Sequence, residues 1–132
     1  MRPLVLIVDD YADARELYRH YLTMQGYGVE EAGDGREAIE RTVRVRPDIV
    51  LMDLSMPGMD GWEATRHIKA DARTARIPVV ALTAQERPIE RARALACGCD
   101  GWVTKPCLPK ALVAMVDRVL ATAQGERPDD RR

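Results

Sequence analysis

Strand-like segments alternate with helical segments five times along this 132-residue chain, and this alternation constrains the fold more than any other feature of the sequence. Leu4–Val8 and 49–52 are wholly apolar and rich in β-branched residues, as is typical of strands buried on both faces. Gly28–Ala32 carries two adjacent glutamates, which favours a place near the sheet edge. Residues 77–82 and 102–104 complete the set of expected strands.

Between the strands, apolar residues recur at helical spacing, and glycine or proline follows several of these segments. The pattern predicts helices over 12–25, 62–72, 89–96 and 108–121, and another around 38–43 that Pro47 ends. Such alternation predicts one α/β domain, with a five-stranded parallel sheet, helices on both faces and right-handed crossovers. The chain contains no phenylalanine, so we expect a largely aliphatic core.

Composition excludes several functional classes. Twenty basic and 21 acidic residues leave a net charge of −1, so no broad cationic surface is expected for nucleic acid or an anionic membrane. No apolar run approaches the roughly 20 residues that cross a bilayer, and no signal-peptide pattern opens the chain, so we expect a cytoplasmic protein. Cys97, Cys99 and Cys107 lack metal-ligand spacing, which favours reduced thiols over a zinc or redox site.

The domain organisation is expected to be simple. Residues 1–122 would form the domain, and residues 123–132 a charged, disordered tail. No segment remains for a DNA-binding or enzymatic output domain, so we expect output to pass through a partner.

Polar residues follow four of the expected strands at the point where each strand ends. In an open parallel sheet, ligands bind beyond these carboxyl ends. Each residue alone has a plain explanation, such as a helix cap or a solvated lysine, and only the joint pattern predicts a site. The residues are Asp9, Asp10, Asp53, Thr83, Thr104 and Lys105.

Three carboxylates at one place repel one another, and a small oxygen-seeking cation such as Mg²⁺ relieves that repulsion. A lysine and a hydroxyl beside them suit an anionic ligand. Metal, carboxylate and lysine together indicate phosphoryl-transfer chemistry. The chain has no G-x-x-x-x-G-K-[ST] motif, which argues against nucleotide binding, and a carboxylate can itself be the nucleophile and become an acyl phosphate.

Four sequence motifs resemble those of the receiver domain of bacterial response regulators, in the same order and spacing. They are VDD at 8–10, LMDLSMPGMDGWE at 51–63, ALTA at 81–84 and GWVTKP at 101–106. The resemblance covers residues 4 to about 120 and implies a doubly wound, flavodoxin-like (βα)5 fold with strand order 2-1-3-4-5.

The resemblance implies a role for each site residue. Asp53 would accept a phosphoryl group from a histidine kinase or a histidine phosphotransfer protein. Asp9, Asp10, Asp53 and the main-chain carbonyl of Ser55 would hold Mg²⁺, with Mn²⁺ as an alternative metal. Thr83 and Lys105 would contact the phosphoryl group, and Lys105-Pro106 would be a cis peptide.

The resemblance also implies a switch. Movement of Thr83 toward the phosphoryl group would let Trp102 enter the space that it leaves, although tyrosine or phenylalanine is usual at this position and a fixed, partly buried tryptophan is the alternative. The reporting surface would be formed by the fourth helix, fifth strand and fifth helix. Its charged residues would be Arg87, Glu90, Arg91, Arg93 and Lys110. We expect a monomer or a phosphorylation-dependent dimer, with a downstream protein target.

Three alternatives stay open. The chain could be a receiver cut from a hybrid histidine kinase or a larger regulator. It could be a small phosphohydrolase with an aspartyl-phosphate intermediate, but that class usually has a second acid two residues after the nucleophile, where this chain has Ser55. It could also be a receiver that binds partners without taking phosphate, against which the full set of site residues argues. No enzyme activity is expected beyond self-phosphorylation and self-dephosphorylation.

Overall fold

A five-stranded parallel sheet forms the centre of the molecule. The computed structural model describes residues 2–54, 61–83, 92–93, 95–104 and 109–125. The strand order is β2-β1-β3-β4-β5, with every neighbouring pair parallel. The strands are β1 (Leu4–Val8), β2 (Gly28–Ala32), β3 (Ile49–Asp53), β4 (Val79–Thr83) and β5 (Gly101–Thr104). The predicted α/β class, parallel sheet and strand order are confirmed.

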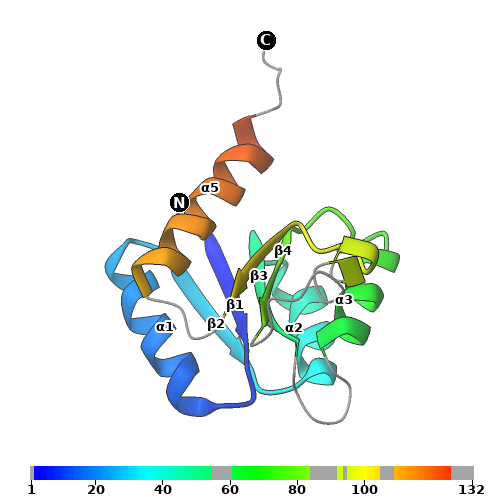
Figure 1. The fold of residues 1–132 in the computed structure, drawn as a ribbon, viewed down its shortest axis with the longest axis horizontal. Coiled ribbons are helices and arrows are strands. Elements are labelled where there is room, and N and C mark those ends of the chain that lie inside the picture. The colour runs from blue at the N-terminus through cyan, green and yellow to red at the C-terminus, as the bar shows by residue number, and fades with distance from the viewer. Residues whose placement is uncertain (1, 55–60, 84–91, 94, 105–108, 126–132) are drawn as a thin grey trace.

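Helices cover both faces of the sheet (Figure 1). α1 (Ala12–Met24) and α5 (Pro109–Gly125) lie on one face, and α2 (Gly35–Val45) and α3 (Gly61–Ala70) lie on the other. Of the helix expected over 89–96, residues 92, 93, 95 and 96 are helical, and its remaining residues lie outside the described part of the chain. No described helix has the length and apolarity needed to cross a membrane.

Alternate residues of each strand enter opposite halves of the core. On one side Leu6, Val50 and Met52 belong to a cluster with α2 and α3. On the other, Ile7 and Leu51 belong to a cluster with α1 and α5. All five side chains are inaccessible to solvent. The side-chain period of two in a strand therefore explains why the apolar runs have no polar face.

The segment between α3 and β4 is longer than the sequence pattern predicts. α3 ends at Ala70 instead of residue 72, and β4 begins at Val79 instead of residue 77. Lys69 explains the late strand start, because its Nζ donates to the main-chain oxygens of Ala75 and Ile77 at 3.4 and 2.8 Å. These bonds hold the segment against the end of α3. α5 also continues to Gly125, four residues beyond the predicted 121.

Cys97 and Cys99 are buried in the cluster on the α2 and α3 side, and neither forms a disulfide. Burial raises the pKa of both thiols, that of Cys99 to about 12. Only the thiolate is an effective nucleophile, so both side chains behave as small core residues near neutral pH. Cys107 lies outside the described residues.

Thiol reactivity tests this placement. In a Cys107→Ser variant at pH 8, we expect Cys97 and Cys99 to react with a thiol reagent more than about a hundredfold more slowly in the native protein than in urea. The rate should rise with pH, because the thiolate fraction increases. Reaction of the native thiols at the rate of a free cysteine would contradict the buried placement.

Candidate functional site

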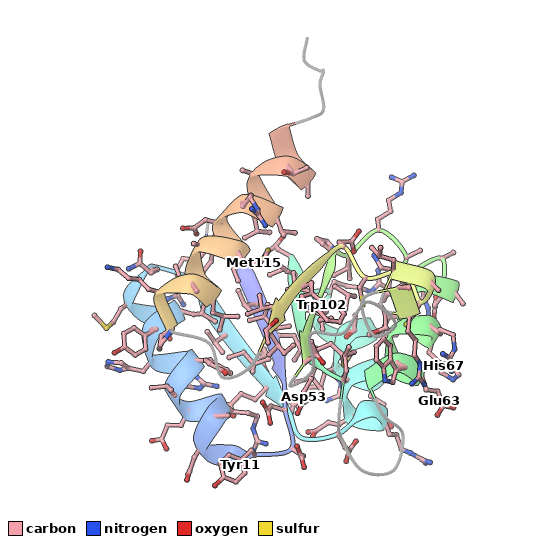
Figure 2. All side chains as sticks on the ribbon, viewed as in Figure 1. Tyr11, Asp53, Glu63, His67, Trp102 and Met115 are labelled. Carbon is pink, nitrogen blue, oxygen red and sulfur yellow. The ribbon has the colours of Figure 1, made fainter. Side chains whose placement is uncertain are left out.

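Three carboxylates meet where β1 and β3 end. Asp9 and Asp10 directly follow β1, and Asp53 is the last residue of β3. One carboxylate oxygen from each lies within 4.8 Å of the others. Asp9 and Asp53 are buried and Asp10 is exposed, so the cluster opens to solvent on one side. Figure 2 shows Asp53 at the same end of the molecule as Tyr11, the residue after Asp10.

The pairing of the strands produces this meeting. β1 and β3 are hydrogen-bonded neighbours, with Val8 opposite Met52, so the next residues, Asp9 and Asp53, come side by side where this pairing ends. Adjacent ionised carboxylates repel one another, and burial strengthens the repulsion. Carboxylate oxygens at this spacing are the ligand type that Mg²⁺ prefers, and the exposed side leaves room for water ligands. The three residues therefore fit a Mg²⁺ ion.

The main chain and the side chain of Asp9 are held by neighbouring groups. The Asp9 amide donates to the carbonyl of Ala32 at 3.2 Å, and Oδ1 accepts from the amide of Tyr11 at 3.0 Å. The Asp9 carbonyl accepts from Nη1 of Arg15 at 2.6 Å. These bonds fix the residue from three directions, which favours a preformed ligand.

Gly61 allows the main chain after β3 to pass close to α3. A Cβ at this position would lie 2.1 Å from the carbonyl oxygen of Asp53 and 2.7 Å from Cα of Leu54. No side chain larger than hydrogen fits against this backbone without moving it. The first residue of α3 therefore helps to fix the position of Asp53.

The fourth and fifth strands also deliver hydroxyl groups to this edge. Thr83 is buried at the end of β4, and it pairs in register with Thr104 at the end of β5. Asp53 pairs with Leu82, so Thr83 lies one residue further along the neighbouring strand. Two threonines and three carboxylates thus lie at the carboxyl ends of their strands, along one edge of the sheet. Ser55, Lys105 and Pro106 lie outside the described residues.

Trp102 lies in the middle of β5, opposite Ala81, and packs against the core cluster on the α2 and α3 side. It is partly buried. It also lines a pocket of about 470 Å³ beside α5, whose other lining residues include Met115, Val119, Arg76 and Arg118. Figure 2 shows Trp102 and Met115 away from the end that carries Asp53.

Sequence reasoning missed two residues that hold the site. Gly61 was interpreted only as preceding a helix, and its close approach to Asp53 depends on a packing distance that no local pattern encodes. Arg15 was not considered. Its place one helical turn after Tyr11 was the available signal, because a long cation there can reach back toward the end of the strand.

Known proteins match both the sequence and the fold. The model of the response regulator receiver domain family matches residues 5–117, and the chain belongs to this family. The DNA-binding response regulator MtrA of Mycobacterium tuberculosis (strain ATCC 25618 / H37Rv) is 38% identical over 116 residues, covering 88% of this chain and 50% of MtrA. The chain spans about half the length of the curated relatives it matches.

Two solved structures are similar throughout the fold. The chemotaxis protein CheY4 of Vibrio cholerae has a TM-score of 0.86 and 34% identity, covering 90% of this chain and 99% of CheY4. The receiver domain of the sensor histidine kinase PA1611 of Pseudomonas aeruginosa PAO1 has a TM-score of 0.84 and 30% identity, covering 92% and 99%. That structure has a magnesium ion coordinated in its active-site cleft. The acidic cluster of this chain is compatible with the same ion.

The relative MtrA bears on the expectation that no nucleic acid is bound. MtrA is a DNA-binding response regulator, so the expectation of no nucleic-acid binding does not extend to longer regulators of this family. The match covers half of MtrA, and this chain contains the receiver domain. The expectation drawn from the balanced charge is therefore restricted to the receiver domain.

Substitution of Gly61 tests the close approach to Asp53. We expect Gly61→Ala to lower the free energy of unfolding by about 1 to 3 kcal/mol, because the added methyl group forces the main chain of Asp53 aside. Urea unfolding measures the change. Gly28→Ala is the matched control, since its Cβ would meet its nearest neighbour, Cδ1 of Leu4, at 3.4 Å. Equal stability of the two variants would contradict the role given to Gly61.

Proposed function

We propose that this receiver domain takes a phosphoryl group on Asp53 in a Mg²⁺-dependent reaction. The observation that carries the proposal is the convergence of Asp9, Asp10 and Asp53 within 4.8 Å at the carboxyl end of the sheet. Membership in the receiver family and the interaction of such domains with histidine kinases support a phosphohistidine as the donor. We assign Asp53 as the nucleophile because it matches the phosphoacceptor position of the receiver family at the end of β3, and β3 and Gly61 hold its main chain in place.

In the transfer, a carboxylate oxygen of Asp53 attacks phosphorus in line with the departing imidazole nitrogen. The P–N bond breaks, its electron pair stays on the imidazole, and the imidazole takes a proton from solvent. When bound, Mg²⁺ neutralises charge on the phosphoryl oxygens and on the attacking carboxylate. Asp9, Asp10 and the carbonyl of Ser55 would hold the metal, with Mn²⁺ as an alternative.

Thr83 and Lys105 would donate hydrogen bonds to the phosphoryl oxygens, and Lys105-Pro106 would be a cis peptide. The phosphoryl group adds a charge of about −1.5 to −2, so a hydroxyl and an ammonium are suitable partners. Hydrolysis of the acyl phosphate by water would reset the domain. Self-phosphorylation and self-dephosphorylation are thus the whole chemistry proposed for residues 1–122.

The signal would leave through the surface of residues 92–96, β5 and α5. The pocket beside Trp102 supports the part of this surface formed by β5 and α5, because it is concave and combines apolar side chains with charged residues, including Arg76, Asp100 and Arg118. Trp102 pairs with Ala81, two residues before Thr83 on β4, so movement of Thr83 would change the packing next to the indole. We propose this coupling as the switch, in a monomer or a phosphorylation-dependent dimer.

An exposed apolar row on α1 supports a protein phosphodonor. Leu17, Tyr21 and Met24 recur at intervals of four and three residues, so they share one face of the helix, and all three are exposed. Tyr11, also exposed, lies between this helix and the acidic cluster. We propose that a helix of the kinase or phosphotransfer protein packs on this row and places its phosphohistidine over Asp53.

The alternatives find less support. A phosphohydrolase needs an acid to protonate its leaving group, and the three clustered carboxylates are all assigned to the nucleophile and the metal. The position two residues after Asp53 is Ser55. A receiver that is part of a hybrid kinase would use the same site. This alternative changes the protein to which the domain belongs but not the chemistry proposed for it.

Replacement of Asp53 tests the proposed phosphoacceptor. With Mg²⁺ and acetyl phosphate, we expect the wild-type protein to gain the mass of one phosphoryl group, in a form that is stable in acid and labile in base. Asp53→Asn should abolish the gain, because an amide oxygen does not form an acyl phosphate. Intact-protein mass spectrometry measures the product, and tryptophan fluorescence reports any accompanying change near Trp62 and Trp102.

Asp13→Asn is the matched control, since this aspartate is exposed in the first turn of α1 and lies outside the cluster. It should label like the wild-type protein. Label on Asp53→Asn at another aspartate would overturn the assignment. Removal of Mg²⁺ with a chelator should also prevent labelling.

A substitution on α1 tests donor docking separately. In a screen of purified histidine kinases, we expect Leu17→Glu to lower phosphotransfer from the best donor at least about tenfold, because a buried charge opposes packing of an apolar helix. Labelling by acetyl phosphate should not change, since the acidic cluster is untouched. An equal loss with both donors would show that the substitution damages the site, and no loss with either would refute the docking surface.

A further inference from the structure

Arg15 connects a proposed metal ligand to the neighbouring strand. Its Nη1 donates to the main-chain oxygen of Asp9 at 2.6 Å, and its Nε donates to Oε1 of Glu31 at 2.9 Å. The side chain is only 21% exposed, so these bonds are partly shielded from water. A planar guanidinium can make both bonds at once, which fixes its own orientation as well as that of its acceptors.

The carbonyl of Asp9 lies just beyond the paired part of β1. The pairing of β1 ends at Val8, which is opposite Ala32 on one side and Met52 on the other. The Asp9 amide still donates to the carbonyl of Ala32, and the Asp9 carbonyl accepts from Nη1 of Arg15. Arg15 therefore continues the hydrogen bonding of the sheet by one peptide.

That peptide joins the two neighbouring carboxylates of the cluster. A peptide unit is planar, so fixing the direction of the Asp9 carbonyl also fixes the bonds that lead to Cα of Asp9 and Cα of Asp10. The Cα atoms of Asp9 and Asp10 are then held in place, and both carboxylates can reach the same ion. Without the bond from Arg15, the peptide plane could rotate and carry the two carboxylates apart.

A cation beside a metal site also repels the metal, and Glu31 offsets this effect. The Glu31 carboxylate accepts hydrogen bonds from Nε of Arg15 and from Nε of Arg19, so it lies between two guanidinium groups. Desolvation by burial raises the pKa of Glu31, but the hydrogen bonds from Arg19 and Arg15 outweigh it, and the pKa lies below its usual value. Glu31 therefore stays ionised near neutral pH and partly neutralises Arg15.

We propose that Arg15 is a positioning residue for Mg²⁺ binding, which acts by fixing the peptide between Asp9 and Asp10 and is itself anchored by Glu31. The inference rests on the Mg²⁺ site of the proposed function. Arg19 provides an internal control, because it shares Glu31 with Arg15 but has no hydrogen bond to Asp9 in the described part of the chain.

The experiment compares Mg²⁺ affinity in Arg15→Met, Arg15→Lys and Arg19→Met by calorimetric titration of the full chain. We expect Arg15→Met to weaken binding about tenfold, the lower end of the effect seen for groups that orient metal ligands. Arg15→Lys should recover part of the loss, because an ammonium can donate to the Asp9 carbonyl. Arg19→Met should bind within about twofold of the wild-type protein, the margin for an exposed ion pair. Thermal unfolding identifies any variant that is not folded.

A metal-free measurement separates this inference from the proposed function. In the absence of Mg²⁺, Arg15→Met should shift the amide NMR resonances of Asp10 and Tyr11, and Arg19→Met should leave them in place. Unchanged Mg²⁺ affinity in Arg15→Met, tighter binding, or an equal loss in Arg19→Met would overturn the positioning role. If the wild-type chain bound no Mg²⁺, the proposed function would fail, and the metal-free spectra would still show whether Arg15 fixes the peptide.

Discussion

The pairing of β1 with β3 is the constraint on which the site depends. In parallel strands at this register, Asp9 and Asp53 follow the last residue pair of β1 and β3 and lie next to each other, and Asp10 is adjacent to them. A buried pair of like charges is unfavourable, so the surrounding structure has to hold them in place. The apolar parts of β1 and β3 provide that stability, because every residue from Val5 to Val8 and from Ile49 to Met52 is buried and contributes apolar contacts.

The groups that fix the carboxylates act mainly on the main chain. Gly61 lets α3 pack directly against the backbone of Asp53, and Arg15 binds the carbonyl of Asp9. The carboxylates are thereby positioned through their backbones, toward the edge of the sheet where we propose that Mg²⁺ and the phosphoryl group bind. In the proposed phosphoryl transfer, a site fixed in this way would need less reorganisation, which is an important part of electrostatic stabilisation.

The sequence predicted the parts of the structure that depend on periodicity and on the ends of strands. The apolar runs predicted all five strands, and the polar residues after them predicted that Asp9, Asp10 and Asp53 lie close together. It did not predict the late start of β4, because the bonds from Lys69 to Ala75 and Ile77 join residues that follow no repeating pattern. Gly61 and Arg15 were missed for the same reason, since their roles arise from distances between elements.

The geometry of β4 and β5 determines how a change at the site could reach the pocket. Thr83 pairs with Thr104, and two residues earlier Ala81 pairs with Trp102, so the four side chains occupy one face of the two strands. Ala81 is small, which lets the indole of Trp102 lie close to β4, and Trp102 also lines the pocket beside α5. A shift of Thr83 toward a phosphoryl group would thus alter the packing of a residue that a partner could contact directly. Because the indole is larger than a phenol, the volume vacated by one hydroxyl and one methyl group would limit how far it moved inward, and we expect only a small reorientation of Trp102 in the proposed switch.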